Sequence, residues 1–168
     1  MDIYRAAERL MTMDDRAWLR HANPWSGWTR FTGLPLLVLA IWSRVWVGWW
    51  SLLPVALAVA WIWLNPRVFG PPKVFDHWMT RAVLGERIFL THRDGIAAHH
   101  LRAAHVLTWL SLPGLCLMGI GLGLLWWEGA VFGTILTMLP KVWFCDRMVW
   151  IHDDWVRAGR AVPGRESA

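Results

Sequence analysis

Two long apolar blocks dominate the chain, and polar segments precede, separate and follow them. The first block covers residues 31–64 and the second covers residues 103–150. Each block is about twice as long as the ~20 residues that one membrane-spanning helix needs, and a tryptophan pair marks a turn within each. The pattern predicts an all-α integral membrane protein, in which four transmembrane helices form two hairpins.

The two arms of the first block are short for membrane spans. Each arm contains roughly 17 residues, which is the lower limit for crossing a bilayer. A hairpin that crosses the membrane twice is the first interpretation, and a re-entrant hairpin that does not reach the far side is the alternative. The second block divides into longer arms, at about residues 103–126 and 130–150.

The segment before the first block, residues 1–30, has the pattern of an interfacial amphipathic helix. Apolar residues recur at helical spacing from Ile3 to Leu10, and Thr12 with Asp15 resembles a capping box that restarts the helix. We expect this helix to lie in the membrane interface or to pack on the rest of the protein.

The connection between the blocks, residues 65–102, is polar and contains several helix breakers. Within it, Asp76 is expected to cap a short helix over residues 77–84 that ends at Gly85. Residues 151–168 form a polar tail. The chain is therefore expected to be a single membrane domain from residue 1 to residue 168.

Composition and charge support a membrane location. Apolar residues make up 56% of the chain and charged residues 17%, and there are 16 tryptophans, which favour the membrane interface. Of the 17 basic residues, 15 lie before the first block, in the connection, or from Arg147 to the end of the chain. The positive-inside rule then predicts a bacterial inner-membrane protein with both termini cytoplasmic. This segregation explains the net charge of +5 without any nucleic-acid partner.

Glycine spacing in the second block predicts close helix packing. Gly119 with Gly123, and Gly129 with Gly133, form two pairs in which small residues are four apart. We expect these pairs to hold the second hairpin together, and a homodimer contact is the alternative.

Histidines and carboxylates on the predicted cytoplasmic side suggest a metal site. Such side chains suit non-haem iron, manganese or zinc. The adjacent His99 and His100 point about 100° apart on a helix, so they could share an ion only if other segments folded over them. The alternative is a set of interfacial histidines that bond water, lipid headgroups or backbone. Haem between His105 and His152 is a weaker possibility. The candidate metal ligands are His21, Glu86, His99, His100 and Asp146.

Two charged positions interrupt the fourth predicted span. Lys141 is either functional or a side chain that extends to the membrane surface, since a charge inside a membrane is costly. We expect Asp146 to be buried and paired with a basic residue from the N-terminal or connecting segment.

Four short motifs resemble those of an uncharacterised family of small prokaryotic multi-pass membrane proteins, a domain of unknown function. The motifs are "HANPWSGWTR", "WLNPRVF", "RAVLGER" and "WFCDRMVW", and the resemblance covers roughly residues 10–155. The resemblance implies a compact membrane protein that faces the cytoplasm. It implies no activity, substrate or cofactor.

The sequence therefore leaves the activity open between two main hypotheses. The first is an accessory inner-membrane subunit whose polar cytoplasmic face binds a membrane-protein partner, lipid or a second copy of the chain. The second is a membrane-embedded, metal-dependent oxidoreductase that acts on a lipid-soluble substrate. A transporter or channel is a third hypothesis and the least favoured one, because four short helices with one lysine offer little pathway for a solute.

Overall fold

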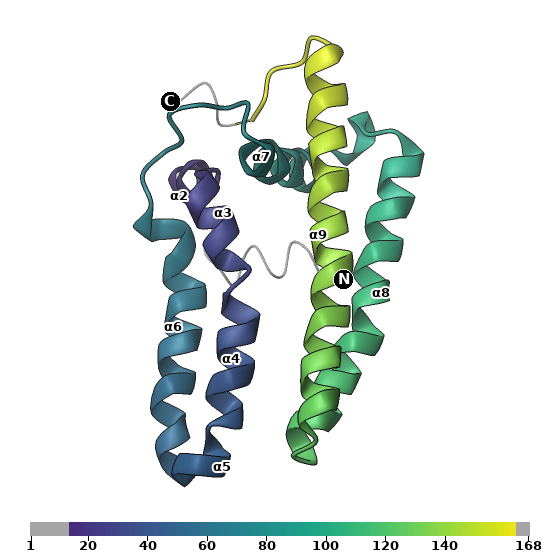
Figure 1. Cartoon of the computed structure of the whole chain (residues 1–168). Coiled ribbons are helices and arrows are strands. Elements are labelled where there is room, and N and C mark those ends of the chain that lie inside the picture. Colours follow the sequence, from purple (N-terminus) through teal and green to yellow (C-terminus); the bar gives the residue numbers. More distant parts are fainter. Residues whose placement is uncertain (1–13, 164–168) are drawn as a thin grey trace. The chain divides into compact units, whose positions relative to one another are not determined.

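The computed structural model describes residues 14–163, and every regular element within that range is helical (Figure 1). Two 3₁₀ turns accompany the α-helices. The α-helices are α2 (Asp15–His21), α3 (Pro24–Arg30), α4 (Gly33–Trp42), α5 (Arg44–Val47), α6 (Leu52–Val68), α7 (Trp78–Thr91), α8 (Ala98–Gly123) and α9 (Trp127–Arg157), and the 3₁₀ turns are η1 (Gly48–Ser51) and η2 (Arg93–Gly95).

The chain divides into two compact units. We call the first the polar unit; its described parts are residues 14–28, 65–104 and 145–163. The second, residues 29–64 and 105–144, is the apolar unit. Only four of the chain's Asp, Glu, Lys and Arg residues fall in the apolar unit, namely Arg30, Arg44, Glu128 and Lys141.

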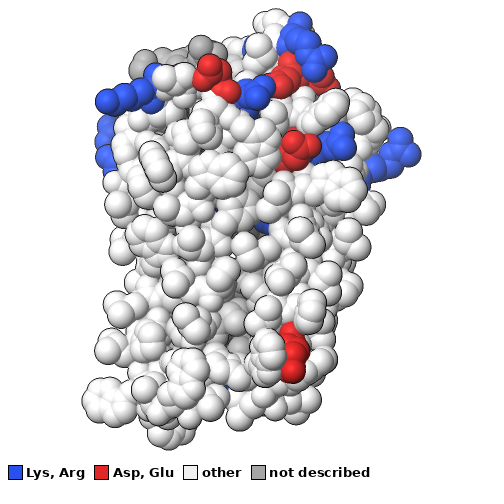
Figure 2. Space-filling model, in the orientation of Figure 1, with Lys and Arg blue, Asp and Glu red and all other residues white. Residues whose placement is uncertain are grey.

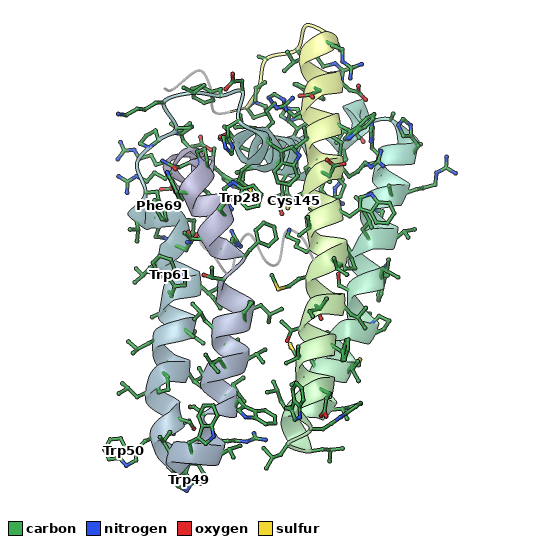
Figure 3. The ribbon with its side chains drawn as sticks, viewed as in Figure 1. Trp28, Trp49, Trp50, Trp61, Phe69 and Cys145 are labelled. Atoms are coloured by element: carbon green, nitrogen blue, oxygen red, sulfur yellow. The ribbon has the colours of Figure 1, made fainter. Side chains whose placement is uncertain are left out.

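The two units also differ in the kind of side chain that they expose. Most of the exposed large hydrophobic residues belong to the apolar unit, including Trp49 and Trp50, which project from the η1 turn and are 87% and 79% exposed (Figure 3). In Figure 2, charged side chains gather over α2 and the C-terminal part of α9, whereas the surface over α4 is almost free of them. The apolar unit therefore has an apolar exterior.

Within residues 14–163, two helical stretches are long and apolar enough to cross a membrane. They are Pro24–Val68, which contains both arms of the α4–α6 hairpin, and Ala98–Gly123. Only 6% and 28% of their most apolar windows are buried inside the protein, whereas the core helix of a soluble protein is mostly buried. Helix α9 is outside this set, since charged residues interrupt its second half. Two candidate spans are thus found where the sequence pattern predicted four.

Glycines bring α8 and α9 together, but they are not all the predicted ones. A Cβ on Gly114, Gly121 or Gly133 would collide with backbone atoms of the opposite helix. A Cβ on Gly119 or Gly123 would meet no atom within 4 Å. Gly114 and Gly121 are seven residues apart and so lie within about 20° on the helix, whereas Gly119 is about 140° away from Gly114.

The prediction that Gly119 and Gly123 hold this hairpin together is therefore wrong. Gly133, in contrast, lies against the backbone of α8 at Met118. Gly129 is buried, but a Cβ there would meet the ring of the nearby Trp126 rather than α8.

Helix α7 lies at the centre of the polar unit, and ten of its fourteen residues are buried. It is longer than the predicted helix over 77–84. His77 rather than Asp76 provides the N-cap, and its imidazole accepts a hydrogen bond from the Met79 amide at 3.2 Å. Gly85 does not end the helix: it lies in the interior, where a Cβ would collide with the Met148 carbonyl of α9.

The N-terminal segment begins its described part with α2. Its N-cap is Asp14, whose carboxylate accepts a hydrogen bond from the Ala17 amide at 2.7 Å, and the Thr12 of the predicted capping box lies outside the described residues. Most of the predicted amphipathic repeat, including Ile3 to Leu10, lies outside the described residues.

Candidate functional site

Two of the motifs quoted above meet in the polar unit. Within "HANPWSGWTR", the Nδ1 atom of His21 lies 3.0 Å from the hydroxyl of Ser26. That hydroxyl donates at 3.3 Å to the side-chain carbonyl of Asn65, which belongs to "WLNPRVF". At the surface, the Asn23 amide group also donates to the Gly70 carbonyl at 2.9 Å. A buried polar network thus joins α2 and α3 to the end of α6.

A serine beside a histidine can be a catalytic pair, but this one is closed to substrates. Ser26 and Asn65 are both 0% exposed, and His21 is 3% exposed. A nucleophile must reach the substrate atom that it attacks. The network therefore stabilises the fold, because buried polar groups need hydrogen-bond partners.

The other two motifs also meet. Gly85 of "RAVLGER" packs against the backbone of Met148 in "WFCDRMVW". Next to this contact, the Trp78 indole N–H donates to Asp146 at 3.4 Å. Asp146 is half-buried, and its partner is this uncharged donor from the connecting segment rather than the basic residue that we expected.

Ion pairs connect the helices of the polar unit. Arg81 of α7 pairs with Asp153 of α9 at 2.8 Å. The buried Arg87 pairs with the exposed Asp15 of α2 at 2.5 Å. Exposed ion pairs contribute little to stability. Arg87 is buried, however, and a buried charge without an oppositely charged partner would destabilise the fold.

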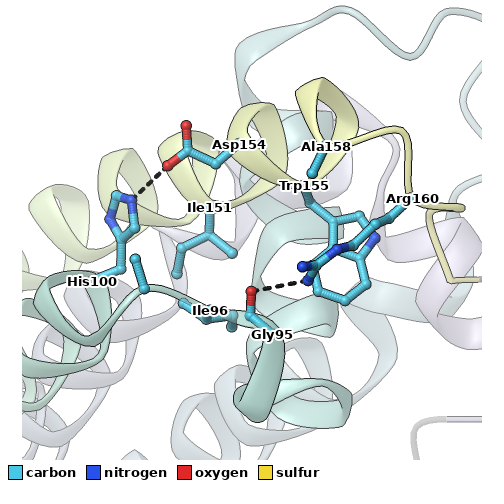
Figure 4. A pocket seen from close by; sticks show the side chains of 9 residues that line it. Gly95, Ile96, His100, Ile151, Asp154, Trp155, Ala158 and Arg160 are labelled. Carbon is cyan, nitrogen blue, oxygen red and sulfur yellow. Dashed lines mark hydrogen bonds and ion pairs between the residues drawn. The ribbon is translucent and has the colours of Figure 1, made fainter.

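A small cavity opens where η2 and the start of α8 meet the end of α9 (Figure 4). Its volume is about 120 Å³, which is room for roughly four water molecules at ~30 Å³ each. His100 and Asp154 face each other across one side, with Nε2 and Oδ2 2.9 Å apart. Ile96 and Ile151 add apolar walls.

Arg160 closes the other side of the cavity. Helix α9 ends at Arg157, and Gly159, at a φ of +70°, reverses the chain. Arg160 then lies over the Trp155 ring at 4.6 Å and donates to the Gly95 carbonyl at 3.0 Å. The cavity therefore offers a carboxylate, an imidazole and a guanidinium to a small polar group.

The predicted metal ligands do not form one site. Within residues 14–163, no three His, Cys, Asp or Glu side chains are grouped so that they could hold a metal ion. Of the five candidates, the structure places only the adjacent His99 and His100 together, with ring centroids 4.1 Å apart. His21 bonds to Ser26 instead, and Glu86 is half-buried on α7.

The imidazole of His100 bonds to Asp154 and that of His152 to Asp153, so both interact with carboxylates of α9. His105, the other haem candidate, is exposed on α8. The turn between α7 and η2 packs against α9, where the His92 ring lies 5.3 Å from the Trp155 ring.

Sequence reasoning missed the residues that build this cavity. Asp154 and Arg160 were not among the candidates, because their partners are 54 and 65 residues away in the chain. One local signal was available: Gly159 follows the last helical residues, as expected of a helix C-terminus.

Comparison with known families identifies the chain. A family model described as a family of unknown function, DUF6653, matches residues 4–168. The chain therefore belongs to the DUF6653 family. No curated protein and no solved structure matches it significantly.

Proposed function

We propose that this DUF6653 protein is a four-span accessory subunit of the bacterial inner membrane. Both termini and the polar unit face the cytoplasm, and the polar unit binds a membrane-protein partner. The observation that carries the proposal is the partition of charge: of the chain's 29 charged residues, the 76-residue apolar unit has four.

The exposed apolar surface supports the membrane placement. Side chains such as Leu57, Ile120 and Phe132 are each more than half exposed on their helices. Exposing a large apolar side chain to water instead of burying it costs roughly 1.5–3 kcal/mol. A soluble monomer with so many of them would aggregate, whereas lipid covers them without cost.

Helix α9 completes the four-span arrangement. Its first half belongs to the apolar unit and packs against α8 from Gly114 to Gly121. Lys141 lies over the Phe144 ring at 4.4 Å, near the boundary at residue 145 between the units. A lysine at that level can extend its ammonium group to the membrane surface.

The rigidity of the polar unit supports a binding role. The ion pairs and the buried Ser26 network fix α2, α7, α8 and α9 relative to one another within that unit. A fixed surface binds without paying for its own ordering. The cavity between His100 and Arg160 is a recess on that surface for a side chain of the partner.

Reporter fusions test the membrane placement. Alkaline phosphatase inserted after Trp49 or Leu125 should be active, since the proposed topology puts both turns in the periplasm. Fusions after Val74 or at the C-terminus should be inactive with phosphatase and fluorescent with green fluorescent protein. Phosphatase activity after Val74 would overturn the proposed orientation.

Site-specific photo-crosslinking in the native host tests the binding role. A crosslinker at Ala158, on the rim of the cavity, should give one discrete adduct with a membrane protein. The matched control is Leu57, an exposed position of the apolar unit, which should give none. The absence of an adduct at Ala158 and elsewhere on the polar unit would contradict the proposal. Stoichiometric iron, manganese or zinc in the purified protein would instead favour the metal-dependent oxidoreductase.

A further inference from the structure

The apolar unit contains a larger cavity at the turn of its first hairpin. Its volume is about 640 Å³. Residues from α4 to the start of α6 form most of its wall, and Leu125, from the loop after α8, completes it. The lining is largely apolar, with Ile41, Leu52 and Val55 among its residues, and Trp49 stands beside it.

Arg44 places a positive charge in this apolar wall. Its guanidinium donates one hydrogen bond to the Leu122 carbonyl near the end of α8, which fixes the side chain. Within residues 14–163, no ion pair joins Arg44 to a carboxylate. A guanidinium has five N–H donors, so most of them remain available to a ligand.

Ser51 supplies a second donor to the same cavity. The residue is only 7% exposed, yet its side chain lines the cavity. Its hydroxyl makes no hydrogen bond to any residue of the described part of the chain. The hydroxyl, which can both donate and accept a hydrogen bond, is therefore available to a ligand in the cavity.

We propose that this cavity binds the phosphodiester group of a membrane phospholipid. Arg44 donates two parallel hydrogen bonds to phosphate oxygens, Ser51 donates a third, and one acyl chain lies along Leu52 and Val55. Arginine suits this task because its planar fork matches phosphate geometry. The inference rests on the membrane placement proposed above, which puts this turn and its tryptophans at headgroup level.

Lipid titration of the purified protein tests this site. The protein is delipidated in detergent and titrated with phosphatidylglycerol, and bound lipid is counted by native mass spectrometry. The wild type should bind one lipid tightly, Arg44→Gln should bind it at least tenfold more weakly, and Ser51→Ala severalfold more weakly. Arg30→Gln is the matched control, because it removes a positive charge from the same unit outside the cavity, and it should bind like the wild type.

Competition with phosphate distinguishes the sources of the phosphate group, and membrane extraction separates a failure of this proposal from a failure of the proposed function. Inorganic phosphate at millimolar concentration should leave the bound lipid in place. If phosphate displaced the lipid at a concentration equal to that of the lipid, the lipid assignment would be overturned. Equal binding by the wild type, Arg44→Gln and Ser51→Ala would also overturn it. If these proteins stay in the membrane after alkaline carbonate extraction, the failure concerns the lipid site alone. Arg44→Lys, which retains the charge, should bind with intermediate affinity, and wild-type affinity would exclude the bidentate contact.

Discussion

Alanine substitutions at Gly133 and Gly119 should have opposite effects on stability, although the two positions belong to the same helical hairpin. An alanine Cβ at position 133 would collide with the backbone at Met118, which cannot move aside like a flexible side chain. An alanine Cβ at position 119 meets no atom within 4 Å. Both changes replace glycine inside a helix, so the gain in helix propensity, up to about 1 kcal/mol, is the same for both.

The difference in free energy of unfolding between the two variants therefore measures the cost of disturbing the contact between α8 and α9. Overpacking costs typically ~1–3 kcal/mol, which should separate the two free energies of unfolding by that amount. For a chain of this size, the gap corresponds to a difference in Tm of roughly 2–12 °C. Thermal unfolding in detergent, followed by tryptophan fluorescence, measures it. Equal Tm values for Gly133→Ala and Gly119→Ala would refute the assigned packing face.

Three further predictions concern the polar unit. Ser26→Ala should lower the free energy of unfolding in detergent by about 1–3 kcal/mol, because it leaves buried polar groups unsatisfied. The control Ser43→Ala, which loses only a local bond to the Ala40 carbonyl, should change it by less than about 0.5 kcal/mol. Gly95→Ala should displace Arg160 and Trp155, since a Cβ there collides with both, and limited proteolysis should then cleave the C-terminal segment faster than in Gly70→Ala, where the added Cβ has open space. Asp15→Asn should lower Tm by a few degrees at low salt and less at high salt, because it removes the charged partner of Arg87; an unchanged Tm would show that the pair contributes nothing.

The membrane-sized blocks and their turns could be predicted because their signals are local. A run of apolar residues of a given length indicates a helix of that length wherever it lies. The turn between α4 and α6 therefore lies at the tryptophan pair, as the pattern indicated. Helix ends were less accurate: α8 begins at Ala98 rather than near residue 103, and α9 continues to Arg157.

The roles of individual polar residues were harder to predict, because each depends on a partner far away in the chain. The spacing of Gly119 and Gly123 matched a packing motif, yet the face that meets α9 is the one that carries Gly114 and Gly121. Periodicity identifies the faces of a helix, but it does not indicate which face meets another helix when lipid and protein are equally apolar neighbours. The same limit applied to His99 and His100, whose neighbours are set by the fold.

The sequence by itself determined the helical class, the two apolar blocks and the segregation of charge, because each depends only on local composition and period. Only the tertiary structure decided that the motifs containing His21 and Asn65 form one buried network, and that Asp154 and Arg160 border one cavity. It also decided that Arg44 and Ser51 share a cavity. These contacts depend on the position and rotation of each helix, which are set by packing between segments that are distant in the chain.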